Sequence, residues 1–244
     1  MNIQFIISVL LFALCNIVSL GASQYEAKEP MQVVLDNSLE LALQKRTVEP
    51  LDNVGKTLSS KKGNVWVYWQ VYLQMCKSVY YSSAKQNDKA KTCLESGIDL
   101  LDTEQNKTTE DYALLGYMQS QFIRYTKGME SGILSAKSKQ NASKAVELDS
   151  KNIRGWVVLG IIDFYTPKQF GGKEKCENYL LKAINLPSQN IQNKYRPSWG
   201  KIEAYTLLLT YYNEKGEKDK VRQYYKKAIK EFPNEPSLKK YEQY

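Results

Sequence analysis

Apolar residues recur at helical spacing along most of the chain, and stretches that alternate in the manner of β-strands are scarce. The clearest example runs from residue 205 to 233, with apolar or small side chains at Tyr205, Leu208, Leu209, Tyr212, Val221, Tyr225 and Ala228. Gly216 interrupts this pattern and Pro233 ends it. The stretch therefore predicts two helices joined by a tight turn, with their apolar stripes facing each other.

The same two-helix pattern occurs three more times before it. One copy has Trp156, Leu159 and Gly160, then Cys176, Leu180 and Ala183. Another has Tyr112, Leu115 and Gly116, then Ser138, Ala142 and Ala145. A weaker first copy has Trp69, Tyr72 and Leu73, then Ala90, Leu94 and Gly97. One helix pair cannot bury its apolar face alone, so we expect the four pairs in residues 64–233 to stack on one another.

This spacing resembles the tetratricopeptide repeat (TPR), whose pattern is W-x2-L-G-x2-Y, then A-x3-F, A and P. The last copy keeps the spacing throughout but has Leu209 and Val221 at the two central small-residue positions. The resemblance implies an all-α, right-handed solenoid of antiparallel helix pairs. The segments "KAVELDSKNIRGW", "FYTPKQFGGKEK" and "PSWGKIEAY" further resemble a group of exported bacterial TPR proteins, which implies a compartment and no reaction.

The N-terminal end of the chain has the pattern of an export signal. Residues 1–22 contain no charged side chain and combine an apolar run, "FIISVLLFALCNIV", with the small residues of "SLGAS". This favours a signal peptide cut near Gly21, Ala22 or Ser23, although a run of this length can also remain as a membrane anchor. We expect residues 23–63 to hold one capping helix, Met31 to Lys45, and a linker, and residues 234–244 to form a C-terminal tail.

Two of the helix pairs contain longer turns than the last pair. Leu209 and Val221 are 12 positions apart, whereas the matching distances are 16 in the third pair and 22 in the second. The extra residues lie in "DFYTPKQFGG" (163–172) and "RYTKGMESG" (124–132). Turns within successive pairs line one edge of a repeat stack, so these insertions predict a binding rim there.

Composition argues against several kinds of function. The formal net charge is +8, but there are only five arginines among 34 basic residues, and the basic residues form no cluster with interleaved aromatic residues. Nucleic-acid sites favour the forked guanidinium of arginine, so we expect no nucleic acid as a partner. The chain has no histidine, no Walker spacing around "FGGK" and no CxxC pair, so we expect no enzyme, no cofactor and no metal site.

Three cysteines remain after the predicted leader: Cys76, Cys93 and Cys176. An odd number in an exported chain does not indicate a disulfide framework. Cys93 and Cys176 lie on apolar helix faces, which favours buried thiols. A Cys76–Cys93 bridge between adjacent antiparallel helices stays open as an alternative.

Candidate binding residues follow from the TPR resemblance. In TPR proteins a stripe on the first helix of each pair lines the concave face. We call the corresponding positions here the inner stripe: Gln70, Gln74, Lys77, Tyr117, Ser120, Arg154, Ile161, Phe164, Tyr165, Thr206, Thr210 and Asn213. This set would suit a peptide or a polar ligand, with Arg154 as the best partner for a carboxylate.

The inserted turn 163–172 adds Lys168 and Gln169 as residues presented to a partner, while Tyr165 and Phe170 are expected to fold onto the helix ends. From these features the sequence favours an exported scaffold that binds a protein or peptide partner. Its alternative is an accessory or small-ligand-binding protein of an envelope transport system. Membrane association is expected only through an uncleaved leader.

Overall fold

The computed structural model describes residues 29–188 and 193–244, and in these residues every regular element is a helix. The leader predicted for residues 1–22 lies outside the described residues. The elements are α2 (Met31–Lys45), α3 (Glu49–Ser59), α4 (Asn64–Ser83), α5 (Asn87–Asp102), α6 (Thr109–Phe122), η1 (Ile123–Tyr125), α7 (Met129–Leu148), α8 (Ile153–Tyr165), η2 (Lys168–Phe170), α9 (Cys176–Asn185), α10 (Lys201–Glu214), α11 (Lys218–Glu231) and η3 (Pro236–Tyr241).

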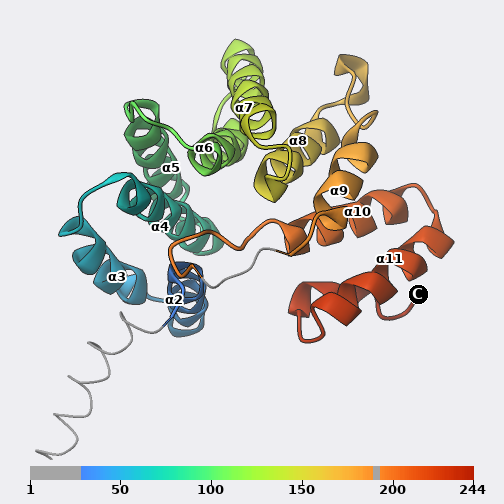
Figure 1. Ribbon diagram of the computed structural model, residues 1–244, viewed down its shortest axis with the longest axis horizontal. Helices are drawn as coiled ribbons and strands as arrows, with labels where there is room; N and C mark the ends of the chain where they lie inside the picture. Colours follow the sequence, from blue (N-terminus) through green and yellow to red (C-terminus); the bar gives the residue numbers. More distant parts are fainter. Residues whose placement is uncertain (1–28, 189–192) are drawn as a thin grey trace, which may run out of the picture.

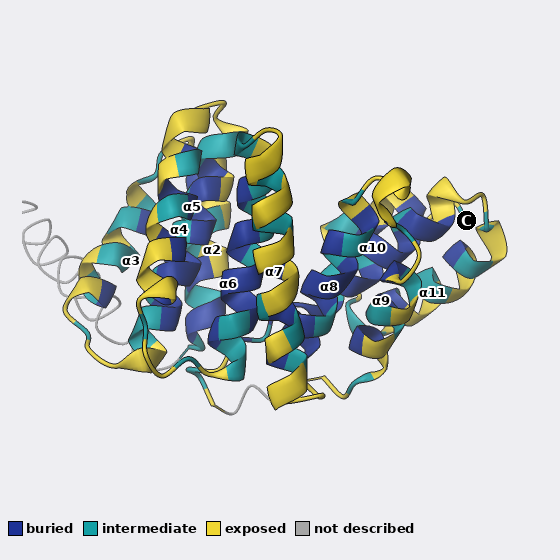
Figure 2. Ribbon diagram, turned by 90° about the horizontal axis from the view of Figure 1, so that it is seen from above, coloured by how far each residue is buried: buried dark blue, intermediate teal, exposed yellow. Residues whose placement is uncertain are grey.

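Consecutive helices pack as antiparallel pairs that follow one another in a curved row (Figure 1). The four repeats read from the sequence are the pairs α4–α5, α6–α7, α8–α9 and α10–α11. Each first helix also contacts the first helix of the next pair, from α4 to α6, α6 to α8 and α8 to α10. The structure thus confirms the all-α solenoid, and Figure 2 shows buried residues concentrated on the facing sides of these helices.

Small residues at the predicted positions let the paired helices approach closely. Ser138 donates a hydrogen bond from its Oγ to the carbonyl of Gly116, at 2.6 Å, across the α6–α7 contact. A Cβ added at Gly116 would lie 2.9 Å from the Ser138 carbonyl oxygen, so this position accepts no larger residue without moving a helix. Ala142, Ala183 and Ala228 are fully buried in the same kind of contact. The repeat spacing therefore reports real helix-packing positions.

The N-terminal part contains a helix that the sequence did not reveal. Where a linker was expected after the first helix, α3 packs with α2 and α4 and buries Leu51 and Leu58. Pro50 lies in the first turn of α3, where a proline is compatible with a helix because its missing N–H has no partner there.

Cys76, Cys93 and Cys176 are buried free thiols, so the alternative of a Cys76–Cys93 bridge is not realised. Burial raises the pKa of the Cys76 thiol well above its usual value, which keeps it protonated and unreactive. Within the described residues, no helix combines the length and the apolar composition that a membrane crossing requires.

The connection before α10 takes an unexpected path. Residues 193–200, here called the return segment, run back from the third helix pair towards α2 and α4 before α10 begins (Figure 1). The amide of Met31 donates to the Lys194 carbonyl at 2.8 Å, which ties the return segment to the start of α2. This path determines what remains accessible on the concave side.

Candidate functional site

The first part of the inner stripe is engaged by α3. Lys77 forms an ion pair with Asp52, with 2.7 Å between Nζ and Oδ1. Gln70 donates a hydrogen bond from its Nε2 to the Leu58 carbonyl at 2.9 Å. Both side chains were expected to face a partner, and both hold a helix of the same chain instead.

The middle of the inner stripe is occupied by the return segment. Trp69 donates from its indole nitrogen to the Tyr195 carbonyl at 3.1 Å, and Trp199 donates to the Tyr68 hydroxyl at 2.8 Å. The ring of Tyr117 lies 5.2 Å from that of Trp199, centroid to centroid. The bond from Trp69 resembles the way a groove holds a peptide, because a side-chain donor from a helix meets a backbone carbonyl of a crossing segment.

Arg154, predicted as the best residue for a partner's carboxylate, is fully buried. Its guanidinium pairs with Glu110 through both Nε and Nη2, the latter at 2.6 Å from Oε1. The remaining nitrogen, Nη1, donates to the Trp199 carbonyl at 3.0 Å and to the Pro197 carbonyl at 3.4 Å. The expectation for Arg154 is therefore not supported by its geometry, because every nitrogen of the guanidinium already has a partner within the chain.

The last part of the inner stripe is covered by the C-terminal residues. Three side chains of α10 pair with hydroxyl groups of residues 237–244: Thr206 with Ser237 at 3.3 Å, Thr210 with Tyr241 at 2.7 Å, and Asn213 with Tyr244 at 2.5 Å. Leu238 and Tyr241 are buried. The stretch expected to be a tail thus contains η3, which packs against the inner side of α10.

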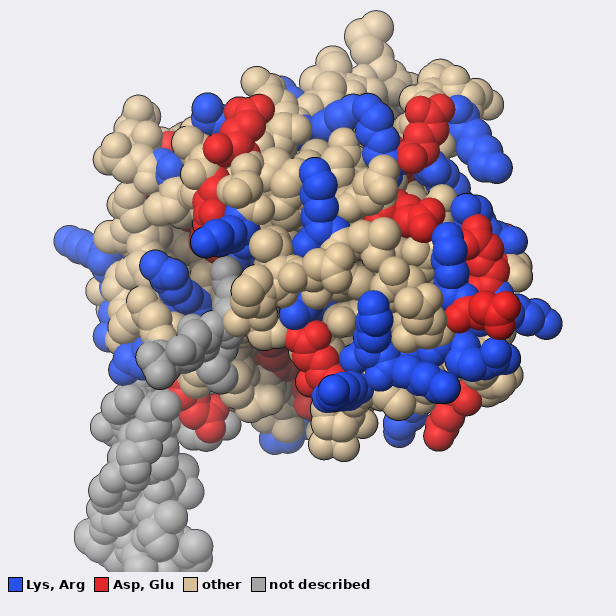
Figure 3. Space-filling model, turned by 45° about the vertical axis from the view of Figure 1, so that its right-hand side comes forward, with Lys and Arg blue, Asp and Glu red and all other residues tan. Residues whose placement is uncertain are grey.

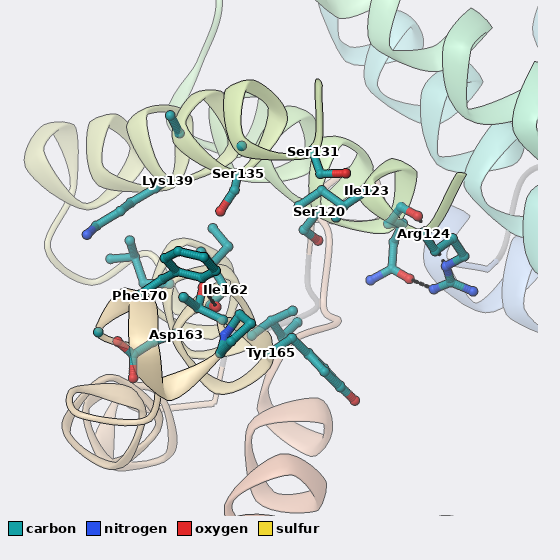
Figure 4. A pocket seen from close by; sticks show the side chains of 18 of the residues that line it. Ser120, Ile123, Arg124, Ser131, Ser135, Lys139, Ile162, Asp163, Tyr165 and Phe170 are labelled. Carbon is teal, nitrogen blue, oxygen red and sulfur yellow. Dashed lines mark hydrogen bonds between the residues drawn. The ribbon is translucent and has the colours of Figure 1, made fainter. Parts of the chain in front are cut away.

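The two inserted turns come together around an open groove of about 960 Å³. One wall is α7, which presents only small side chains and one lysine there: Ser131, Gly132, Ser135, Ala136 and Lys139. The other wall is the end of α8 and the turn after it, with Leu159, Ile162, Tyr165, Pro167 and Phe170. The end of α6 and η1 close the groove with Ser120, Ile123 and Arg124 (Figure 4). Residues that are distant in sequence thus form one site.

The turn 163–172 is ordered by its own hydrogen bonds. Helix α8 ends at Tyr165, as the proline at position 167 predicted, because the residue before a proline is disfavoured in helical geometry. Asp163 accepts from the amides of Lys175 and Cys176, at 2.9 and 2.7 Å, and so caps the start of α9. This explains why an acid occupies a position where the repeat pattern usually has an aromatic residue.

Both glycines of this turn are required by its shape. Gly171 has a φ angle of 79°, in the left-handed region that favours glycine. A Cβ on Gly172 would lie 1.7 Å from the Thr166 carbonyl oxygen, which leaves no room for any side chain. The turn therefore holds a fixed wall beside the groove.

Tyr165 and Phe170 lie on the surface, contrary to the expectation that their rings would fold onto the helix ends. Tyr165 is 72% exposed and Phe170 is 74% exposed. Met129, at the start of α7 and outside the residues that line the groove, is 83% exposed. These are the three most exposed large apolar side chains of the described residues. Two exposed aromatic rings at one groove are typical of an interaction site.

The remaining predicted residues either contact other parts of the chain or lie at the open groove. Phe164 is buried, with the Lys173 ammonium 4.5 Å from its ring centroid, so it is part of the core. Lys168 and Gln169 are exposed in η2, beside Phe170. Of the eight residues predicted to bind a partner, Tyr165 lines the open groove and Lys168 and Gln169 lie in its turn. The others are Lys77, Tyr117, Arg154, Phe164 and Asn213, which contact other parts of the chain.

Sequence reasoning missed the α7 side of the groove. Ser135 and Lys139 belong to no repeat position and lie beyond the predicted insertion 124–132, which includes Ser131; only the length of that insertion pointed to this edge. Within the described residues, no group of three or more acidic, cysteine or histidine side chains is arranged to bind a metal ion. The arrangement of the groove is suited to binding an apolar group.

Comparison with solved structures supports the fold. The chain is similar to a thermophilic TPR protein of Thermus thermophilus, with a TM-score of 0.55, 15% identity, and coverage of 86% of this chain and 97% of that one. It is also similar to the HusA haemophore from Porphyromonas gingivalis, with a TM-score of 0.53, 20% identity, and coverage of 74% and 92%. No protein-family model and no curated protein sequence matches the chain.

Proposed function

We propose that this protein is a non-catalytic helical-repeat scaffold that binds a partner protein through the groove between its two inserted turns. The observation that carries the proposal is that Phe170 and Tyr165, two of the three most exposed large apolar side chains of the described residues, line this groove, while the inner stripe is largely covered by the chain itself. The apolar side chains of this groove are exposed to water in the free protein. A partner that binds there gains free energy by burying them.

We also propose that the chain acts outside the cytoplasm, in the periplasm or at the envelope. The support is the uncharged apolar run and the small residues of positions 1–22. Mass spectrometry of the envelope fraction is expected to show an N-terminus near Ala22 to Gln24. A cytoplasmic chain that retains Met1 would contradict export.

Nucleic acid is not the partner we propose. On the face shown in Figure 3, basic side chains are interspersed with acidic ones. Many lysines are engaged in ion pairs with neighbouring carboxylates, as Lys220 is with both Glu177 and Glu217. Such a surface lacks the single-sign field that binds a phosphate backbone.

Photo-crosslinking from the groove tests the main proposal. Phe170 is replaced by the photoreactive amino acid p-benzoylphenylalanine, and the variant is irradiated in envelope extract. We expect a discrete crosslinked band that is absent when the same replacement is made at Leu148, which is exposed at the far end of α7. Identical bands from both positions, or no band from position 170, would contradict the proposal.

A second candidate function is favoured by one observation, the similarity to a haemophore. A groove of about 960 Å³ with exposed aromatic rings also has the size of a small-ligand site. In this case the protein would be a carrier of an aromatic small molecule. Titration with haemin, followed by absorbance, tests it: saturable binding that Phe170→Ala weakens would favour the carrier, and binding that ignores this substitution would exclude the groove.

A further inference from the structure

The charges at the groove are not balanced within the chain. Arg124 and Lys139 line it, and in residues 29–188 and 193–244 neither forms an ion pair with a carboxylate. Arg124 is oriented by Gln121, since it donates from Nε to the Gln121 carbonyl at 3.1 Å and from Nη2 to the side-chain oxygen. The lining carboxylate, Asp163, already accepts two amides of the chain. The groove therefore has an excess of positive charge beside one apolar wall, which is formed by the end of α8 and the turn after it.

The two cations lie at opposite ends of the groove (Figure 4). Arg124 is in η1, and η1 is joined to the start of α7 by the contact between Thr126 and Ser131, whose hydroxyl oxygens are 2.9 Å apart. Lys139 lies eight residues beyond Ser131 on α7. At a rise of 1.5 Å per residue, Ser131 and Lys139 lie about 12 Å apart along the axis of α7.

The first half of α7 has no helix beside it on the groove side. In residues 129–140 of α7 only Ser138 is buried, and this half of the helix projects beyond its neighbours with mostly exposed residues (Figure 2). Helix α7 is 20 residues long, whereas α9, the corresponding helix of the next pair, has 10. Because α9 is the shorter helix, the groove lies at the place that a longer α9 would fill.

We propose that the occupant of the groove is an amphipathic helix of the partner protein that carries an apolar face with a carboxylate towards each end of it. The apolar face packs between α7 and the rings of Tyr165 and Phe170, and the carboxylates meet Arg124 and Lys139. This inference rests on the proposed function and adds the chemistry of the partner. Charge complementarity of this kind selects the partner and its register more than it adds affinity.

Two synthetic helical peptides test the charge selection. Each has about 18 residues, a length at which helices can form in water. They share one apolar face and differ only in two positions, one towards each end of that face, which are Glu in one peptide and Lys in the other. Fluorescence anisotropy with the full chain is expected to show at least about tenfold tighter binding of the acidic peptide at low salt.

Charge reversal at the groove provides the decisive variant. Arg124→Glu with Lys139→Glu is expected to reverse the preference, so that the basic peptide binds tighter. The matched control, Lys137→Glu with Lys226→Glu, changes the net charge equally at exposed positions outside the groove and is expected to keep the preference of the wild type. Circular dichroism verifies that both variants fold.

The outcomes separate this inference from the proposed function. No binding of either peptide, no preference between them, or a preference that the control variant loses equally would overturn the helix proposal. If crosslinking from position 170 still captures a discrete partner in those cases, the groove remains the binding site and only the chemistry assigned to its occupant is wrong. If crosslinking from position 170 captures no partner but the acidic peptide binds selectively, the chemistry assigned to the occupant is supported and the proposed function in the cell is not.

Discussion

Trp199 and Phe170 are large aromatic residues in two irregular segments of the chain, with opposite environments. Trp199, in the return segment, is 7% exposed and makes a hydrogen bond and a ring contact with the inner helices. Phe170, in an inserted turn, is 74% exposed at the rim of the groove. The concave side, where a TPR scaffold is expected to bind, has been filled by the chain, and an open apolar surface remains at the edge.

This difference shows that a helical-repeat chain can cover its concave surface with a segment of its own, and that the resulting contacts stabilise the fold. The return segment connects α2, α4, α6 and α8, and its contacts with α2 and α4 span more than a hundred positions of sequence. A partner that competed for the concave side would have to displace buried rings and an ion pair. The groove between the inserted turns requires no such displacement.

The largest expected effect is that of Trp199→Ala. Removing a buried tryptophan leaves a cavity and the unpaired Tyr68 hydroxyl, so we expect a loss of about 3–5 kcal/mol in the free energy of unfolding, measured in urea. A loss below about 1 kcal/mol would show that the return segment is not packed as described, and would reopen the concave side as a binding surface.

Arg154→Ala is expected to destabilise the protein by roughly 3 kcal/mol, at the lower end of the range for breaking a buried ion pair. The value is at the lower end because Glu110 keeps 24% of its side chain exposed and can be partly hydrated. Arg154→Lys serves as the control, since it keeps the charge but loses the forked geometry, and should lie between wild type and alanine. Urea unfolding monitored by tryptophan fluorescence measures all three.

Gly172→Ala tests the fixed wall of the groove. Because the added Cβ would collide with the Thr166 carbonyl, the turn must rearrange, and we expect a cost of about 1–3 kcal/mol together with weakened partner binding. For stability, Gly132→Ala is the matched control, since nothing lies within 4 Å of a Cβ there and α7 tolerates alanine; it is not a control for binding, because Gly132 lines the groove. Equal stability of both variants would mean that the turn adapts freely.

The packing of the concave side is expected to make the stability of the protein depend on pH. Burial raises the pKa of the Glu203 carboxyl, which accepts a hydrogen bond from the amide of Gly200, at the end of the return segment. A raised pKa in the folded state contributes stability below the unfolded pKa, and this contribution is lost as the pH rises through the folded value. Glu203→Gln replaces the titrating carboxyl group with a neutral amide, so the variant does not lose this contribution as the pH rises.

We therefore expect the stability of Glu203→Gln relative to wild type to improve between about pH 4 and about pH 7. Urea unfolding at both pH values measures the difference. A relative stability that falls over this interval would show that the hydrogen bond to Gly200 outweighs the burial of the carboxylate.

The smallest expected effect on stability is that of Phe170→Ala, the counterpart of Trp199→Ala. Because the ring is mostly exposed, the free energy of unfolding should change by less than about 0.5 kcal/mol. Capture of the partner should nevertheless be lost. A destabilisation close to that of Trp199→Ala would place the ring in the core and remove the main support for the groove.

The sequence by itself determined the repeat. The apolar spacing located the four helix pairs, and small residues such as Gly116 and Ala228 marked helix contacts, because burying an apolar stripe demands a fixed period. The lengths of the insertions pointed to the edge of the stack at which the two inserted turns line one groove. Pro167 and the glycines at 171 and 172 determined the shape of one turn, since these are local backbone constraints.

Only the tertiary structure decided which of these surfaces stays accessible. Nothing local in "YRPSWGK" indicates that it returns to Trp69 and Arg154, because a contact across so many residues depends on the curvature of the whole stack. For the same reason the sequence predicted an accessible Arg154 and a Phe170 ring folded onto the helix ends. Burial is a property of how distant segments meet, and a periodic pattern records only which side of each helix is apolar.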